Sequence, residues 1–502
     1  MHNPSIYQIN TRIILQERGV ALGRPAIFDD LEDRFLDDIA AKGFEWVWFL
    51  GVWQTGPAGR AISRSNVKLV EECRRDLPNL REEDITGSPF AIVAYETHKD
   101  FGGDRALAKI RERLSRRGLK LLLDFVPNHT ALDHPWVNKH PEYYIPGTAD
   151  DLARQPQNYA RVGSGRDARI LAYGRDPYFD GWPDTYQLNY RHAGLREARI
   201  AELGAIAGRC DGVRCDMAML LQPQIIAKTW GDRSKPADGS PPKDSPFWSE
   251  AIPVIKRRHP NFLFVAEVYW DMEWELQQAG FDYTYDKRLY DRLVAQQARP
   301  VREHLMADAA FQDHSMRFLE NHDEPRAAAT FPKPVHKAAA VVALLARGLR
   351  FIYEGQLEGR RVHPSMHIGR RPAEPVDEEL QAFYRRFLEC LKRPETRDGQ
   401  WRLESCRPAW SGNGSSDQFI VSSWQAGERR LLTVVNYGGT QAQCYVTLGM
   451  EGLRGRSFKL VDLLSDLTYQ REGDGLAGPG LYLDVPPWGH YVFDLQPSGA
   501  RP

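Results

Sequence analysis

The sequence predicts an α/β fold: a (β/α)8 TIM barrel with an inserted domain after its third strand and a C-terminal antiparallel β-sandwich domain. Three observations support this fold class. Short apolar runs alternate with amphipathic helical stretches, an irregular segment interrupts them after the third run, and only strand-like runs come last. The length of 502 residues is enough for a large barrel and a smaller second domain.

Eight apolar runs are expected to form the barrel strands. Most are apolar on both sides of the pleat, as strands are when helices cover one face and a packed barrel interior covers the other. In chain order, the runs are residues 5–10, 44–52, 119–126, 210–216, 262–268, 280–285, 316–321 and 349–353.

The segments between these runs have the apolar spacing of helices. Asp104 is a candidate cap for a helix that Gly118 is expected to stop. Ser245 and Pro246 are expected to begin another helix, as its cap and its first helical residue. The last barrel helix is expected at about residues 377–391.

The domain boundaries follow from where this alternation changes. We predict a barrel over residues 1–395, with residues 128–190 as an inserted domain rich in Tyr, Trp, Pro and Gly. Residues 396–502 are expected to form the β-sandwich, because several short strand-like runs are separated there by turns. These runs are residues 419–424, 431–436, 444–448, 458–463 and 491–495.

Composition narrows the classes of function. There are 66 Lys and Arg against 67 Asp and Glu, so no net charge favours nucleic acid or an anionic membrane. The longest apolar run is too short to span a bilayer, and the first residues do not resemble a secretory signal. The six cysteines are scattered without a CxxC pair, which suits reduced thiols and predicts a cytoplasmic protein.

Acidic side chains stand at the ends of several predicted strands. Because the carboxyl ends of barrel strands converge on one basin, these acids are expected to lie together, which raises their pKa values and indicates function. Glycoside cleavage needs such a set, since one carboxylic acid protonates the leaving oxygen and a carboxylate attacks the anomeric carbon. A single acid at a strand end is more often a helix cap or a surface acid. The acids are Asp124, Asp216, Glu267 and Asp323.

The strings at residues 124–129, 212–216, 266–268 and 320–323 resemble, in order and spacing, the four short signature segments of the α-amylase family (glycoside hydrolase family 13). The resemblance implies a catalytic barrel and makes the insertion at 128–190 the domain B of that family.

The resemblance also implies roles for individual residues. Asp216 would be the nucleophile, Glu267 the acid/base, and Asp323 a third acid that binds sugar hydroxyls. The remaining residues would bind or orient: Arg214 would orient Asp216 and keep it ionised, His129 and His322 would hydrogen-bond the sugar, and Asp124 would brace the network.

Three departures from the family pattern matter. Phe90 stands where the family has a Tyr that stacks under the sugar, so it is expected to line the substrate site without a hydroxyl. Gln187 replaces an Asp that is a calcium ligand in many amylases, and residues 217–220 lack the Lys-His of typical endo-amylases. Losing a carboxylate weakens a site for a hard cation, so we expect no required cofactor and no essential calcium.

The predicted function is that of a retaining α-glycosidase, acting on α-glucosidic bonds of oligosaccharides or soluble glucan through a covalent glycosyl-enzyme intermediate. The alternative is a transglycosylase or isomerase that transfers a glucosyl or maltosyl unit with the same residues. A non-catalytic binding scaffold is the third class, and it would be expected to lack Asp216, Glu267 or Asp323. The expected partner is a carbohydrate, an α-glucoside or maltooligosaccharide, with no nucleic acid and no membrane.

Overall fold

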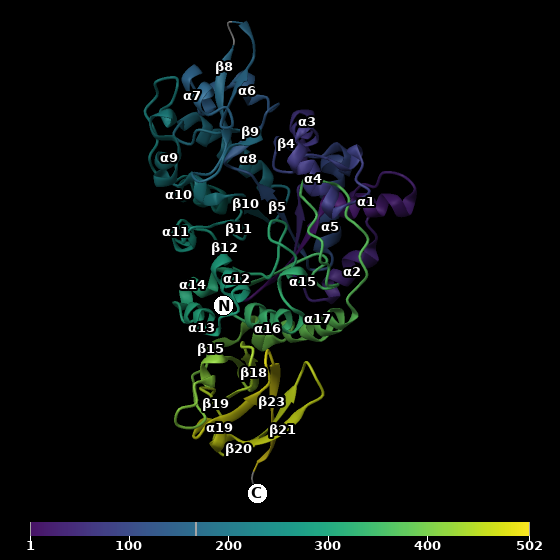
Figure 1. Cartoon of the computed structure of the whole chain (residues 1–502), viewed down its shortest axis with the longest axis vertical. Coiled ribbons are helices and arrows are strands. Elements are labelled where there is room, and N and C mark those ends of the chain that lie inside the picture. Colours follow the sequence, from purple (N-terminus) through teal and green to yellow (C-terminus); the bar gives the residue numbers. More distant parts are fainter. Residues whose placement is uncertain (1, 166–167, 501–502) are drawn as a thin grey trace.

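A computed structural model describes residues 2–165 and 168–500, and in it the predicted strands close into a parallel barrel (Figure 1). The order around the barrel is β1-β14-β13-β12-β11-β10-β5-β2. The predicted fold class is confirmed. The strands are β1 (Ser5–Asn10), β2 (Trp46–Leu50), β5 (Lys120–Phe125), β10 (Gly212–Cys215), β11 (Leu263–Ala266), β12 (Tyr283–Tyr285), β13 (Ser315–Arg317) and β14 (Leu349–Tyr353).

The first and last of these strands have the predicted bounds, and the others are shorter than predicted. The largest difference is at the seventh strand, which ends at Arg317 rather than at residue 321. The chain leaves the sheet there because Glu320 binds outside it, accepting from Arg326 Nη1 (2.7 Å) and from the backbone N–H of Ala327 (2.6 Å). Residues 320–323 therefore lie in a loop.

Helices surround the barrel, and two predicted helix starts are wrong. Helix α5 begins at Gly103, and Asp104 instead accepts from the N–H and the hydroxyl of Thr97, both at 2.8 Å. Helix α10 begins at Phe247 with Pro246 as its N-cap, because the hydroxyl of Ser245 accepts from Arg196 Nη2 (3.3 Å) instead of from a backbone N–H of the helix. The helices around the barrel are α1 (Thr11–Leu22), α2 (Asp33–Ala41), α5 (Gly103–Ser115), α8 (Ala193–Ala207), α10 (Phe247–Arg258), α12 (Lys287–Val294), α13 (Ala298–Leu305), α16 (Lys333–Leu344) and α17 (Glu378–Leu391).

The predicted insertion after the third strand is a separate antiparallel sheet. Its strand order is β6-β9-β8-β7, with β6 (His129–Ala131), β7 (Tyr159–Val162), β8 (Arg169–Gly174) and β9 (Trp182–Gln187). Two short helices, α6 (Trp136–Lys139) and α7 (Ala149–Arg154), accompany it.

A second insertion, which the sequence did not predict, follows the second barrel strand. A two-stranded ribbon, β3 (Trp53–Thr55) and β4 (Ile92–Thr97), brackets the helices α3 (Pro57–Ser65) and α4 (Val67–Asp76). Helix α3 packs against β9, where Gly59 lies close to Asp184, so the two insertions meet above the barrel.

The remaining helices lie on the loops of the barrel, except for one on the connection to the C-terminal domain, α18, and one inside that domain. They are α9 (Pro223–Trp230), α11 (Glu273–Gln278), α14 (Ala309–Asp313), α15 (Ala327–Thr330), α18 (Pro394–Asp398) and, in the C-terminal domain, α19 (Gly473–Ala477).

Two antiparallel sheets form the C-terminal β-sandwich, in the orders β15-β17-β18-β23-β20-β21 and β16-β19-β22. Strands β15, β16, β21 and β22 were not predicted. Every residue of β21 is exposed, so it carries no apolar pattern. The strands are β15 (Gln400–Leu403), β16 (Cys406–Pro408), β17 (Phe419–Ala426), β18 (Arg429–Asn436), β19 (Ala442–Val446), β20 (Arg456–Asp462), β21 (Thr468–Glu472), β22 (Leu481–Val485) and β23 (His490–Ala500).

The large sheet of this sandwich faces two cores at once. Along β17, Phe419 and Val421 point into the sandwich, whereas Ile420 and Trp424 join the core of the barrel. This division follows the alternation of side chains along a strand. Trp424 also donates through its indole N–H to the carbonyl of Leu345 (2.8 Å), just after α16. One face of the sheet is therefore continuous with the barrel core.

Two further observations concern the chain as a whole. Within residues 2–165 and 168–500, no helix is long and apolar enough to cross a membrane. All six cysteines are unpaired.

Candidate active site

Two of the predicted acids lie at the carboxyl ends of barrel strands, and a third lies in a loop that follows another strand. Asp216 directly follows β10 and Glu267 directly follows β11, and the backbone continues the ladder at both positions. The N–H of Asp216 donates to the carbonyl of Phe125 (2.8 Å), and the N–H of Glu267 donates to that of Cys215 (3.0 Å). Asp323 comes from the loop after β13. Strand register thus fixes the first two acids side by side.

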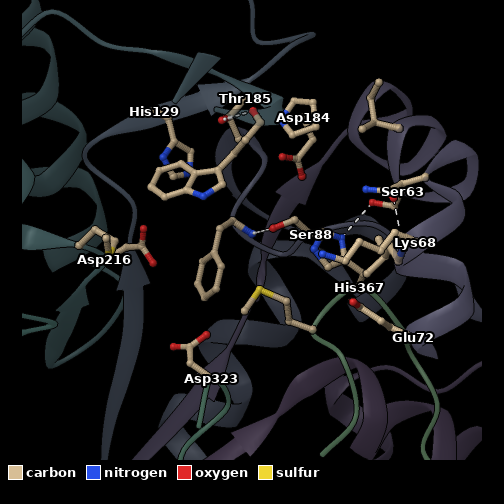
Figure 2. A pocket seen from close by; sticks show the side chains of 18 of the residues that line it. Ser63, Lys68, Glu72, Ser88, His129, Asp184, Thr185, Asp216, Asp323 and His367 are labelled. Carbon is tan, nitrogen blue, oxygen red and sulfur yellow. Dashed lines mark hydrogen bonds between the residues drawn. The ribbon is translucent and has the colours of Figure 1, made fainter. Parts of the chain in front are cut away.

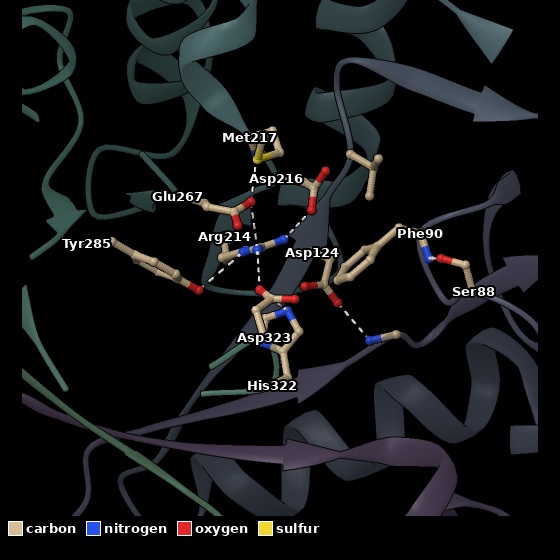
Figure 3. Close-up of polar contacts among 12 residues, drawn as sticks. Ser88, Phe90, Asp124, Arg214, Asp216, Met217, Glu267, Tyr285, His322 and Asp323 are labelled. Carbon is tan, nitrogen blue, oxygen red and sulfur yellow. Dashed lines mark hydrogen bonds and ion pairs between the residues drawn. The ribbon is translucent and has the colours of Figure 1, made fainter. Parts of the chain in front are cut away.

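Arg214 joins all three acids from the middle of β10 (Figure 3). Its side chain is fully buried, with Nη1 2.6 Å from Asp216 Oδ1 and Nη2 2.8 Å from Glu267 Oε2. Nη2 also lies 3.8 Å from Asp323 Oδ2. A planar guanidinium presents donors in a fixed fork, so one side chain holds the acids on one wall of the barrel mouth.

The Glu267 carboxylate receives two further hydrogen bonds, from the backbone N–H of Met217 (2.6 Å) to Oε2 and from the hydroxyl of Tyr269 (3.0 Å) to Oε1. Met217 can donate in this direction because its backbone is left-handed, with φ of 42°. A non-glycine residue adopts that conformation at a cost of about 1–3 kcal/mol, which the surrounding packing must offset. The residue after Asp216 therefore helps to orient Glu267.

The charges of this cluster do not balance, because one guanidinium faces four carboxyl groups. Desolvation raises the pKa of Asp216 and of Asp323 to about 7 each, although Arg214 opposes both shifts. Burial likewise raises the pKa of Asp124 to about 6 and moves the pKa of Glu267 upward. Close carboxylates cannot all ionise together, so the cluster retains a proton near neutral pH. A proton donor beside an ionised carboxylate is the pairing that acid-assisted nucleophilic attack requires.

This electrostatic arrangement predicts how stability depends on pH. With a pKa for Asp216 raised from near 4 to about 7, the folded protein binds more protons than the unfolded chain between those values, so stability falls as pH rises through that range. Asp216→Asn removes this dependence and should stabilise the fold at pH 8 by up to about 4 kcal/mol, but little at pH 4.

Thermal unfolding of Asp216→Asn and wild type at pH 4, 6 and 8 measures this effect. Asp466→Asn, at a fully exposed carboxylate of the C-terminal domain, is the control. An Asp216→Asn protein that is no more stable than wild type at pH 8 would contradict the predicted electrostatics.

A cavity of about 490 Å³ opens onto the three acids that Arg214 holds (Figure 2). Five of the predicted site residues line it: Phe90, His129, Asp216, Glu267 and Asp323. Burial lowers the pKa of His129 to about 3, so this imidazole is neutral and can exchange hydrogen bonds with uncharged hydroxyl groups.

The other three predicted residues lie behind the cavity wall. Arg214 packs its guanidinium 5.2 Å from the ring centre of Phe90. His322 Nε2 lies 3.2 Å from Asp323 Oδ2, while its Nδ1 pairs with Gln8 (2.9 Å). Asp124 accepts from the N–H of Gly51 (2.7 Å) and from the indole of Trp48 (3.1 Å). These contacts tie the wall to the barrel core.

The opposite wall of the cavity comes from the two insertions and from the loop after β14, and the sequence did not predict its residues. Ser63 of α3 hydrogen-bonds His367 Nδ1 (2.9 Å), and Lys68 and Glu72 of α4 lie beside them (Figure 2). Asp184 of β9 is only 7% exposed, and its Oδ2 has no hydrogen-bond partner among the described residues. A buried carboxylate oxygen without a partner is an acceptor available to a bound hydroxyl group.

The segment that holds calcium in many family members has a different chemistry here. The amide nitrogen of Gln187 donates to three oxygens: the carbonyl of Asn128 (3.1 Å), the Oδ1 of Asn128 (2.9 Å) and the carbonyl of Leu188 (3.1 Å). The point where these oxygens converge is thus filled by a neutral donor. Among the described residues, no group of three His, Cys, Asp or Glu side chains could hold a metal ion. The residues do not fit a calcium ion at this position.

The chain is similar in sequence to known proteins. A family model described as the alpha amylase catalytic domain matches residues 92–363. The chain is 22% identical over 481 residues to "Alpha-amylase MalA" of Haloarcula japonica, covering 94% of this chain and 59% of that protein. It is 24% identical over 272 residues to the "Alpha-1,4-glucan:maltose-1-phosphate maltosyltransferase" of Rhodospirillum rubrum, covering 52% of this chain and 32% of that protein. The chain thus spans less than two thirds of the length of these relatives.

Solved structures show the same fold. The maltogenic alpha-amylase AmyB from Thermotoga neapolitana superposes with a TM-score of 0.67 at 18% identity, covering 98% of this chain and 99% of that chain. An alpha-amylase from Lactobacillus plantarum superposes with a TM-score of 0.64 at 20% identity, covering 98% of each chain.

Proposed function

This chain belongs to the α-amylase family, and on that premise we propose that it is a retaining enzyme acting on α-glucosidic bonds of oligosaccharides or soluble glucan. The observation that carries the proposal is the trio of Asp216, Glu267 and Asp323, held by one buried arginine at the wall of a cavity. A scaffold protein would have no use for three converging acids whose mutual repulsion costs stability.

The reaction would proceed in two displacements. Asp216 attacks the anomeric carbon while Glu267 gives its proton to the departing glycosidic oxygen, leaving a glycosyl ester on Asp216. Glu267, now a carboxylate, takes a proton from the incoming water or sugar hydroxyl as that oxygen displaces the ester. Retention requires the Asp216 and Glu267 carboxyl groups to be about 5–5.5 Å apart, and we predict that spacing in a complex with a substrate analogue.

The alternative is transfer of the glycosyl unit to a sugar, and a group of exposed rings favours it as the second candidate. Trp270 and Trp274 are 36% and 47% exposed on the segment just after Glu267, and the ring of Tyr178 lies 4.9 Å from that of Trp270. Exposed aromatic faces offer sugar rings a surface to stack on. An acceptor held there would compete with water for the glycosyl ester.

The test of the proposal is incubation with a panel of α-glucosides and maltooligosaccharides, with and without a sugar acceptor or phosphate, and chromatography of the products. Release of products that keep the α-configuration is expected. Longer products with added acceptor would select transfer over hydrolysis. Activity on no α-glucoside, in a preparation shown to be folded, would refute the proposed function.

We further propose that the enzyme needs no calcium, because the Gln187 amide already bridges the oxygens that would bind it. A chelator should leave activity and the thermal midpoint unchanged. Gln187→Asp removes the bridging donor and supplies a carboxylate, so this variant should be less stable until calcium is added.

Calorimetry of wild type, Gln187→Asp and the control Gln187→Asn, each with chelator or with calcium, measures these effects. Gln187→Asn should lose stability that calcium does not restore. Loss of wild-type activity in chelator, recovered only with calcium, would contradict the proposal.

A cytoplasmic location is also proposed. It is supported by the six unpaired cysteines, since the cytoplasm keeps thiols reduced. Short, neutral maltooligosaccharides would be the substrates available to the enzyme there.

A further inference from the structure

A second cavity, of about 790 Å³, lies outside the catalytic cavity, among residues of α1, α3 and the turn at Lys99–Phe101. Its volume is within the range of about 300–1,000 Å³ typical of small-molecule sites. One part of its lining is apolar, with Leu15, Pro25 and Phe101, and another part is strongly basic.

The most unusual residue of this second cavity is Arg12, at the start of α1. Its side chain donates to the hydroxyl of Thr86 (3.0 Å), the hydroxyl of Thr55 (3.3 Å) and the carbonyl of Gly87, all of them uncharged. Arg12 is only 9% exposed and forms no ion pair among the described residues. Burial and the nearby Arg60 lower the pKa of Arg12 to about 10, so it remains charged at neutral pH. A buried charge without a counter-ion is costly, and an anionic ligand would offset that cost.

Two more cations of the cavity lack acidic partners, namely Arg60 and Lys99, which form no ion pair within residues 2–165 and 168–500. Two of the three acids in the lining, Asp84 and Glu83, are already paired with cations outside the cavity. Asp84 binds Arg370 (2.6 Å), and Glu83 binds Arg81 (2.8 Å). The third acid, Asp100, is largely exposed and lies beside His98 (3.7 Å), so the three cations Arg12, Arg60 and Lys99 outnumber the acids left without a partner.

We propose that this cavity binds the phosphoryl group of a small molecule between Arg12, Arg60 and Lys99, with any organic part against its apolar side. Guanidinium groups match the geometry of phosphate oxygens through paired hydrogen bonds. A dianion also satisfies several cations at once, which a carboxylate does less well. The ligand is either inorganic phosphate or its monoester.

A shared wall would connect this site to the catalytic cavity. The segment 86–90 separates the two, since Arg12 binds its Thr86 and Gly87, while Ser88 and Phe90 face the catalytic cavity. The Thr86 hydroxyl also donates to the carbonyl of His367 (3.2 Å), which lines the catalytic side. A phosphate that binds Arg12 would shift the segment that carries Phe90 and would thereby change the affinity of the catalytic cavity for sugar. By thermodynamic linkage, sugar binding would change the affinity for phosphate by the same factor.

Isothermal titration with inorganic phosphate and with glucose 6-phosphate, at constant ionic strength set with sodium chloride, tests the proposal on the full chain. Arg12→Gln risks misfolding, so the variants are Arg60→Ala and Lys99→Ala, at exposed positions. Arg64→Ala is the matched control, because Arg64 is on the same helix but binds Glu82 (3.0 Å) away from the cavity.

We expect saturable phosphate binding that Arg60→Ala weakens about ten-fold or more, since one charge-assisted hydrogen-bonding partner is lost. Arg64→Ala should change it less than about two-fold, because its charge lies outside the cavity. Tighter binding of glucose 6-phosphate identifies an ester as the ligand, and equal binding identifies free phosphate. The proposal is overturned if wild type binds no phosphate above the chloride background, or if Arg60→Ala and Lys99→Ala both bind it as wild type does. Neither result depends on whether the enzyme cleaves glycosides.

Discussion

Asp216→Asn is expected to form no glycosyl-enzyme on any substrate and to lose activity by at least about 10⁴-fold, the scale seen when a covalent nucleophile is removed. Asparagine keeps the shape of the side chain, but it has no negative charge with which to attack the anomeric carbon. Its amide can still accept from Arg214, so the wall that holds Glu267 should persist.

Mass spectrometry of the intact protein, after reaction with an α-glucosyl fluoride, measures the adduct directly. The control is Asp466→Asn, whose carboxylate is fully exposed, and it should react as wild type does. An adduct of normal mass on the Asp216→Asn protein would show that another group is the nucleophile.

Glu267→Gln is expected to fail differently, because a glutamine cannot donate a proton to the leaving oxygen. Natural glycosides need that proton, so their turnover should fall about 10²–10⁴-fold. A fluoride leaves without it, so α-glucosyl fluoride should still glycosylate Asp216. The ester should then accumulate, because the general base for its breakdown is also missing.

Added azide separates these steps, because it attacks the ester without a base. Azide should restore turnover of Glu267→Gln and give an α-glucosyl azide. Glu275→Gln, at an exposed acid of α11, is the control and should respond to azide as wild type does. If Asp216→Asn forms the adduct and Glu267→Gln does not, the two roles are reversed.

The barrel could be predicted because its strands are buried on both faces, which leaves continuous apolar runs in the sequence. The bounds of the first and last barrel strands in the chain, Ser5–Asn10 and Leu349–Tyr353, could be predicted to the residue. The end of the seventh strand could not, because the ion pair of Glu320 with Arg326 draws the chain out of the sheet. Strand β22 was not predicted, although its sequence does alternate between buried and exposed residues, with Leu481, Leu483 and Val485 buried.

The acid wall of the cavity could be predicted because each acid stands within a short string at a strand end. The opposite wall could not. Ser63 and His367 meet although 304 positions separate them in the chain, and no local motif marks either one. Among the described residues, Asp184 Oδ2 has no hydrogen-bond partner and Arg12 has no ion-pair partner, and both properties depend on the surroundings in three dimensions, which no spacing in the sequence reports.

The double-faced sheet of the C-terminal domain has a consequence for how the protein unfolds. Because Ile420 and Trp424 complete the core of the barrel, removing this sheet would expose apolar surface on α16 and its neighbours. The barrel therefore does not have a self-contained core. Although the barrel and the β-sandwich are distinct in the fold, we expect the protein to unfold in one cooperative transition on heating. Proteolytic cleavage near residue 399 should yield two fragments that remain associated.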